Sequence, residues 1–306
     1  MMAFTAKDVQ ALREMTGVGM MDCKKALTET DGDMNKAVEY LREKGLAASQ
    51  KKAGRIAAEG MAYAAVVDGV GVVVEVNAET DFVAKNEKFV DFVKGVAATV
   101  AANKPADLEA LMACKYAGTD LTVTEQQQEM VLVIGENIKV RRFAFYTEGV
   151  SVPYIHAGGK IGVLVNLETG LTAEQVETVG KDVAMQIAAL NPRFLDKSEV
   201  SQDVLDEEKK IMLVQMENDP KMAAKPEKVK EGIVAGKLGK FYKENCLLQQ
   251  EFVKDGSVSV EQYIQNSAKA LGGAVTLKAA SRFEKGEGIE KKQENFAEEI
   301  AKQLGK

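Results

Sequence analysis

The chain has 306 residues, 46% hydrophobic and 28% charged, a composition typical of a globular protein of about two domains. Its formal net charge of −6 argues against general nucleic-acid binding, because contacts to phosphates need a concentrated basic surface. His156 is the only histidine, which excludes a metal site built on several histidines and an acid–base pair of two histidines.

Residues 1–50 predict an N-terminal module of three short helices. The first begins after Thr5, a residue type that caps helices by accepting a bond from a backbone N–H group, and the third is expected to end at Gly45. Between the first two helices lies a glycine-punctuated turn that leads into Met20 and Met21. Their flexible side chains suit either adaptable contacts or filling of a small core. Residues 51–60 are expected to form a polar linker.

An internal repeat follows this linker. The segment "VGVVVEVNAETDFVAKNEKFVDFVKGVAATVAANKP" (70–105) aligns with "IGVLVNLETGLTAEQVETVGKDVAMQIAALNP" (161–192). Each copy predicts a strand, a threonine-containing turn and an amphipathic helix, and each is preceded by a further strand candidate. Asp68-Gly69 is a hairpin signal between the first two strands. We therefore predict an α+β fold of duplicated β-β-α core subdomains with antiparallel sheets, one over 61–145 and one over 146–195 and 251–285.

The segment 196–250 changes to a helical pattern. Two helices with a narrow apolar stripe are separated by a break at 219–228, which predicts an inserted, projecting helical hairpin of the coiled-coil kind. After the hairpin come a helix with a glycine stop and a strand candidate, "AVTLKAASRFEKGEG" (274–288), that would return to a sheet. Residues 286–306 are expected to form a C-terminal module with a last amphipathic helix.

Phe82 raises a question of its own, because the sequence places it at the start of a predicted helix. Thr80 and Asp81 are both good N-cap residues, so Phe82 would lie in the first helical turn. It is then either a hydrophobic contact back onto the preceding strand or a wedge offered to another molecule. In the second copy of the repeat the nearest apolar residue, Leu171, precedes its cap, whereas Phe82 follows its own. Both interpretations stay open at this point.

The chain shows no pattern of covalent catalysis, metal binding or membrane insertion. No apolar run approaches the ~20 residues that span a bilayer, and the first residues lack the features of a secretory signal. Cys23, Cys114 and Cys246 are odd in number and far apart, so we expect reduced thiols. The segment "AGKLGK" (235–240) has the wrong spacing for a phosphate-binding loop. We expect a cytoplasmic protein without catalytic residues, metal, cofactor or membrane association.

Five segments carry a resemblance to a known family. They are "LREMTGVGMMDCKKAL" (12–27), "EVNAETDFVAK" (75–85), "IGENIKVRRF" (134–143), "HAGGKIGVLV" (156–165) and "RFEKGEGIEK" (282–291). The first two resemble the two signature segments of the bacterial-type elongation factor Ts family, and the others resemble further segments of that family in the same order. The resemblance covers essentially the whole chain. Ala78 departs from it, since the family more often carries Cys or Ser there.

The resemblance implies a guanine-nucleotide exchange factor for elongation factor Tu, the GTPase that delivers aminoacyl-tRNA to the ribosome. It implies that the N-terminal module, which is UBA-like in the family, and the C-terminal helix contact the nucleotide-binding domain of that partner. The hairpin would be a coiled-coil or dimerisation module, which makes a homodimer an option. Direct nucleic-acid binding is not expected.

The resemblance also implies which residues meet the partner. One segment would intrude near the Mg²⁺ and phosphate site of the GTPase, namely Thr80, Asp81, Phe82 and Val83. Leu12, Met20 and Met21 would be contacts of the N-terminal module. His156 would belong to a contact of the second subdomain with a β-barrel domain.

Two other classes of function remain as alternatives. A non-exchanging, holdase-like scaffold would use the same three-helix module and hairpin, but it would bind its partner equally with or without nucleotide. A hydrolase would have to depend on His156 alone. Release of fluorescent GDP from elongation factor Tu discriminates the exchange factor from both.

Overall fold

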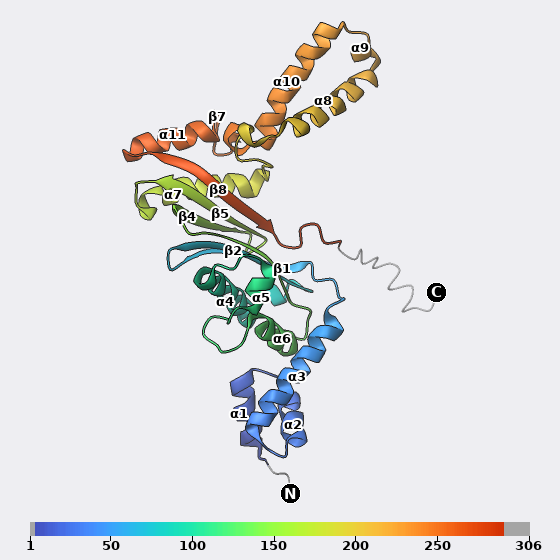
Figure 1. Cartoon of the computed structure of the whole chain (residues 1–306), viewed down its shortest axis with the longest axis vertical. Coiled ribbons are helices and arrows are strands. Elements are labelled where there is room, and N and C mark those ends of the chain that lie inside the picture. Colours follow the sequence, from blue (N-terminus) through green and yellow to red (C-terminus); the bar gives the residue numbers. More distant parts are fainter. Residues whose placement is uncertain (1–3, 291–306) are drawn as a thin grey trace.

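The structure, a computed structural model, describes residues 4–290 and combines helices with antiparallel strands (Figure 1). This confirms the predicted α+β class. The N-terminal helices lie at one end of the elongated molecule, two sheets lie in the middle, and a helical hairpin projects at the other end (Figure 1). The predicted C-terminal helix falls in residues 291–306, outside the described residues.

The first sheet has the strand order β1-β2-β3, with all pairs antiparallel. Its strands are β1 (Glu59–Val67), β2 (Val70–Ala78) and β3 (Lys139–Tyr146). The predicted hairpin turn is confirmed: Asp68 and Gly69 have φ of 49° and 80°, and Val67 pairs with Val70. Positive φ at both central residues is the geometry of the tight hairpin turn that suits the twist of strands.

The second sheet repeats this arrangement with the order β4-β5-β8. Its strands are β4 (Val150–His156), β5 (Ile161–Thr169) and β8 (Val275–Glu284). The strand that was expected to return to a sheet is therefore confirmed as β8, which pairs antiparallel with β5. A small two-stranded sheet precedes β8 in the sequence and consists of β6 (Glu251–Phe252) and β7 (Asp255–Ser259).

Alternate residues of the two central strands face different layers. Val72, Val74 and Val76 of β2 belong to the core under the first helical layer, together with Phe89 and Phe92. Val73 instead packs with Ala64 of β1 and Leu164 of β5, so the second face of the first sheet lies against the second sheet. Because both faces are covered, every residue of β2 is buried.

Helices cover the outer faces of the sheets, as Figure 1 shows for α4 and α7. Those of the first half are α4 (Glu87–Asn103), α5 (Leu108–Ala113) and α6 (Val123–Ile134), preceded by the 3-10 turn η1 (Val83–Lys85). Those of the second half are α7 (Ala173–Leu190) and α11 (Val260–Leu271), with 3-10 turns η2 (Lys197–Glu199) and η3 (Leu247–Gln249). In each half the first α-helix after the strand, α4 after β2 and α7 after β5, is the one that the repeat predicted.

A buried carboxylate ties the two sheets together. Glu75 of β2 has no exposed surface, and it accepts hydrogen bonds from Arg141 (2.9 Å) and Arg142 (2.5 Å) of β3. It also accepts one from the backbone amide of Gly286, which follows β8, at 2.8 Å. A buried charge is tolerated when it is paired and hydrogen-bonded in this way. The turn after the last strand is thus fixed to the centre of the first sheet.

The N-terminal helices are α1 (Ala6–Thr16), α2 (Met20–Glu29) and α3 (Met34–Lys52). Three helices and the Thr5 cap were predicted correctly, but the end of the third at Gly45 was wrong, because α3 continues to Lys52. Gly45 is buried against α6, and a Cβ there would lie 3.2 Å from the carbonyl oxygen of Gln128. The glycine permits close packing of α3 on α6 rather than ending the helix.

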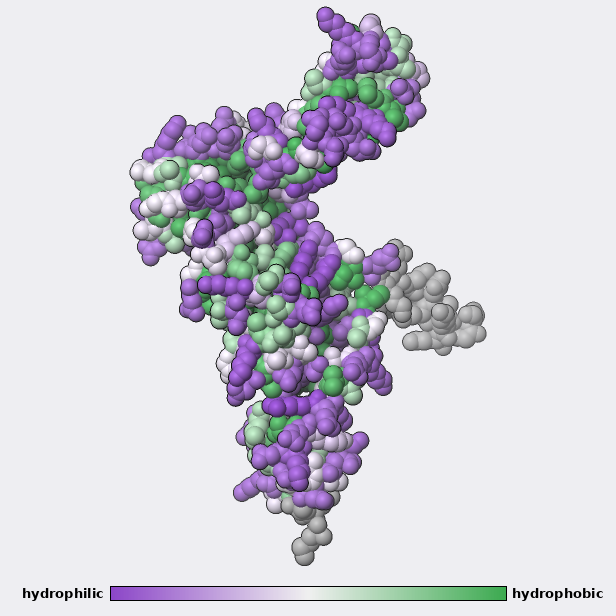
Figure 2. All heavy atoms as spheres, viewed as in Figure 1, coloured by the Kyte–Doolittle hydropathy of each residue, from purple (hydrophilic) through white to green (hydrophobic). Residues whose placement is uncertain are grey.

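The projecting hairpin consists of α8 (Gln202–Glu217), α9 (Pro220–Ala223) and α10 (Glu227–Asn245). The predicted break holds the short helix α9, with Pro220 in its first turn. Met212, Met216, Val234 and Phe241 form a small buried cluster between the long helices. Hydrophobic side chains gather along the hairpin behind a hydrophilic tip (Figure 2). Within residues 4–290, no helix is both long and apolar enough to cross a membrane.

Candidate partner-binding site

Phe82 lies on the surface, in the turn between β2 and α4. Its side chain is 80% exposed, whereas Phe89 and Phe92 of α4 are 0% and 1% exposed. The interpretation of Phe82 as a core contact is therefore wrong. The expected capping is also wrong: α4 begins at Glu87, and its cap is Asn86, whose Oδ1 accepts a bond from the amide of Lys88 (3.0 Å). The cap lies five or six residues later than predicted, which leaves Phe82 in an exposed turn before the helix.

The turn that carries Phe82 is held by the carboxylate of Glu136, just after α6. One oxygen of Glu136 accepts the backbone amides of Glu79 (3.1 Å) and Thr80 (3.0 Å), and the other accepts the Thr80 hydroxyl (2.6 Å). In return, Glu79 accepts the backbone amide of Asn137 at 2.6 Å. Thr80 thus acts as an anchor of the turn instead of a helix cap.

Val83 secures the other side of the turn. Its side chain is 7% exposed and packs in the core under α4, while Asp81 and Phe82 beside it are exposed. Of the four predicted site residues, Asp81 and Phe82 therefore present side chains to solvent, and Thr80 and Val83 hold them in place. Sequence reasoning missed Glu136, although it lies within the quoted segment "IGENIKVRRF".

The N-terminal helices present three methionines. Met15, Met20 and Met21 are 66%, 42% and 75% exposed. Leu12 is 0% exposed and lies in the small core of these helices, which corrects the direct surface contact expected of it. Met15 was not singled out, because its spacing of three from Leu12 looks like a continuation of the buried stripe.

A concave surface connects these two regions. Three adjoining hollows of about 330, 470 and 370 Å³ all have Gly17 and Lys88 in their walls, and we call this space the Gly17–Lys88 gap. Phe82 lines one hollow and Met20 lines another. The fold therefore brings Met20 and Phe82, which are far apart in sequence, to the same side of the molecule.

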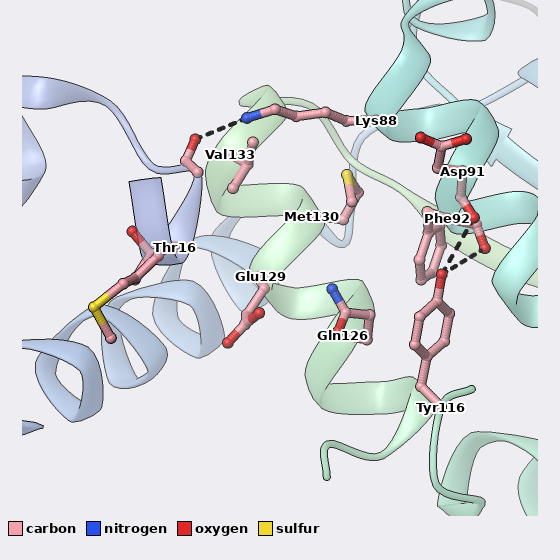
Figure 3. A pocket seen from close by; sticks show the side chains of 11 residues that line it. Thr16, Lys88, Asp91, Phe92, Tyr116, Gln126, Glu129, Met130 and Val133 are labelled. Carbon is pink, nitrogen blue, oxygen red and sulfur yellow. Dashed lines mark hydrogen bonds between the residues drawn. The ribbon is translucent and has the colours of Figure 1, made fainter. Parts of the chain in front are cut away.

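Figure 3 shows the hollow of about 330 Å³ in this gap. Its floor is formed by α6, with Gln126, Glu129, Met130 and Val133, and one wall carries Tyr116. The Tyr116 ring stacks on Phe92 with centroids 5.7 Å apart, and burial raises the pKa of Tyr116 to about 12. Its hydroxyl stays protonated at neutral pH and donates to backbone carbonyls of α4. Tyr116 therefore supports the wall of this hollow and does not act as an acid–base group.

His156 lies elsewhere. It is exposed at the end of β4, and it does not line the Gly17–Lys88 gap. Its ring Nδ1 is 3.0 Å from the hydroxyl oxygen of Tyr154. Neither a carboxylate nor a serine or cysteine is bonded to it in the described part of the chain, so the geometry gives no support to a hydrolase.

Comparisons with known proteins point to one family. The family model described as "Elongation factor TS" matches residues 79–287, which include the Phe82 turn and Glu136. Elongation factor Ts of Clostridium botulinum (strain Eklund 17B / Type B) is 50% identical over 306 residues, which cover 99% of this chain and 99% of that protein. Elongation factor Ts of Trichlorobacter lovleyi is 51% identical over 313 residues, with 99% of both chains covered. That of Syntrophotalea carbinolica is 49% identical over 303 residues, with 98% of this chain and 99% of its own covered.

Proposed function

Because this chain belongs to the elongation factor Ts family, we propose that it is a guanine-nucleotide exchange factor in translation elongation. It binds elongation factor Tu in the GDP-bound state, displaces Mg²⁺ and promotes release of GDP, so that GTP can bind. The protein itself makes no covalent bond in this role. The observation that carries the proposal is the 80% exposed Phe82 on an anchored turn.

An exposed aromatic side chain on a rigid turn is suited to insertion into a partner. Burying a Phe side chain contributes about 1.5–3 kcal/mol, which corresponds to about tenfold to over a hundredfold in an equilibrium constant. The turn is already ordered by Glu136 and by the buried Val83, so little conformational freedom is lost on binding. Most of the gain from burying Phe82 therefore remains available to the complex.

Insertion promotes exchange through thermodynamic reciprocity. If the exchange factor weakens the binding of nucleotide to the GTPase by some ratio, bound nucleotide weakens the binding of the exchange factor to the GTPase by the same ratio. Displacing Mg²⁺ produces such coupling, because the ion bridges and neutralises phosphate oxygens. The exposed carboxylate of Asp81, next to Phe82, would add repulsion towards those phosphates.

The other regions supply affinity and assembly in this proposal. Residues 1–50 dock on the nucleotide-binding domain through Met15, Met20 and Met21, with Leu12 supporting them from below. The second half of the core contacts a β-barrel domain near His156. The hairpin within 196–250 acts as a coiled-coil dimerisation module.

The direct test is release of fluorescent GDP from elongation factor Tu as the concentration of this protein is raised. We expect the release rate to rise and then saturate. An unchanged rate would refute exchange. Binding that is equal with and without GDP would instead indicate the non-exchanging scaffold.

A further inference from the structure

Lys88 bridges the two regions that carry the proposed contacts. It lies in the first turn of α4, and its ammonium group donates to the carbonyl oxygen of Gly17 at 3.1 Å, across 71 residues of sequence (Figure 3). Gly17 ends α1 and is followed within three residues by Met20, while Lys88 follows Phe82 by six. One side chain thus links the end of α1 to the helix that begins beside the Phe82 turn.

The position of Lys88 is unfavourable for its own helix. A positive charge in the first turn of α4 faces the positive end of the helix dipole. The carbonyl of Gly17 lies at the opposite kind of helix end, where unpaired carbonyls carry partial negative charge. The ammonium group reaches this carbonyl although Glu14 and Asp91 line the same hollows and offer carboxylates. Lys88 is itself exposed, so the ammonium group makes this contact at the surface of the molecule.

Gly17 ends α1 in the left-handed conformation and leaves room for the Lys88 ammonium group. Its φ of 68° lies in the left-handed region, which favours glycine, and a Cβ there would lie 2.9 Å from the Lys88 Nζ. A side chain at position 17 would therefore strain the end of α1 and displace the ammonium group.

The N-terminal helices also pack along α6. Gly45 of α3 packs on Gln128, Arg42 forms an ion pair with Glu129 (3.5 Å), and Leu132 and Val133 pack against the small core of these helices. The Lys88–Gly17 bond comes from α4, so it adds a contact from a second helix of the core.

We propose that Lys88 is a positioning residue that fixes the N-terminal helices relative to the Phe82 turn, so that Met20 and Phe82 meet the GTPase in one geometry. This inference rests on the proposed exchange function for its effect on activity. Its structural part concerns this chain alone. A preorganised pair of contacts binds more tightly than two that must be ordered on binding.

The decisive variant is Lys88→Met in the full chain, which keeps the aliphatic stem and removes the donor. Lys88→Arg restores a donor, and Lys94→Met is the matched control, because Lys94 lies on the same helix and pairs only with exposed Asp91 in the described structure. Urea melts of all three should match the parent, which shows that the variants fold.

The first readout is the distance distribution between spin labels on exposed Lys25→Cys of α2 and exposed Asp120→Cys of the core, in a Cys114→Ser background because Cys23 and Cys246 are buried. We expect Lys88→Met to broaden the distribution, and Lys88→Arg and Lys94→Met to leave it narrow. A parent-like distribution in Lys88→Met would overturn the inference, whether or not the protein catalyses exchange.

The second readout is GDP release from elongation factor Tu. For Lys88→Met we expect the concentration for half-maximal exchange to rise several-fold while the saturated rate stays near that of the parent, with recovery in Lys88→Arg. An unchanged half-maximal concentration would overturn the role in exchange. Absence of exchange by the parent protein would refute the proposed function, and the distance measurement would still decide whether Lys88 fixes the helices.

Discussion

Replacing Phe82 with alanine separates a wedge from a core residue, because the two roles affect different measurements. Truncating a fully buried Phe to Ala costs about 3–5 kcal/mol of stability. With 80% of the Phe82 side chain exposed, about a fifth of that burial is at stake, so the expected loss is under about 1 kcal/mol. A urea melt of Phe82→Ala should therefore lie close to that of the parent.

Exchange should respond much more strongly. Full burial of Phe82 in the partner would contribute about 1.5–3 kcal/mol. Loss of this contribution would lower the coupling by about tenfold to over a hundredfold. We expect GDP release from saturated elongation factor Tu to slow by at least several-fold. The saturated rate is the quantity to measure, because the proposed docking through the N-terminal helices does not involve Phe82.

Phe89→Ala is the matched control, since Phe89 is 0% exposed in the core under α4. It should lose the full ~3–5 kcal/mol expected for a buried Phe. If Phe82→Ala melted as early as Phe89→Ala, the turn would be packed inward. If Phe82→Ala melted like the parent and also exchanged like the parent, the wedge would be refuted.

Three further predictions follow from the same geometry. Glu136→Ala leaves the amides that hold the Phe82 turn without their acceptor, so a urea melt should show a loss of about 1–3 kcal/mol and the saturated exchange rate should fall. The double change Met20→Ala, Met21→Ala should raise the concentration of half-maximal exchange with little effect on the saturated rate, because these exposed side chains supply contact area only. Replacing residues 202–245 by a short linker should leave most exchange activity on monomeric elongation factor Tu, provided that Leu247 is kept, since it belongs to the second core.

Each of these has an outcome that contradicts it. Parent-like exchange by a destabilised Glu136→Ala protein would show that anchoring the turn is unnecessary. A fall in the saturated rate of the methionine variant would mean that Met20 and Met21 act on the nucleotide site itself. Loss of exchange by a folded chain without 202–245 would show that the hairpin contributes more than assembly.

The strands and the repeat were predictable because their signals are local. The valine-rich run of β2 and the Asp68-Gly69 pair indicate a strand and a turn within a few residues. Helix ends were harder to predict, because one residue type can serve two purposes. Gly45 looked like the end of a helix, but it permits close contact of α3 with α6. Thr80, Asp81 and Asn86 are all residue types that cap helices, and Asn86 is the one that caps α4.

The candidate site was predictable only in part. The signature segments identified Phe82 and Met20, but their approach to one concave surface depends on tertiary packing. The Lys88–Gly17 bond spans 71 residues, and no local pattern reveals such a contact. The burial of Leu12 and Val83 likewise follows from the assembled cores and not from their motifs.

The order of the strands has a consequence for synthesis of the chain. Partners within the first sheet are separated by 66 residues, as for Glu75 and Arg141, whereas Thr169 at the end of β5 bonds to Ala274, 105 residues later. At about 5–20 residues per second, that second interval lasts about 5–20 s on the ribosome. Throughout it, β5 lacks its β8 neighbour while the first sheet is complete. The face of the first sheet that carries Val73 is therefore synthesised well before the second sheet that covers it is complete.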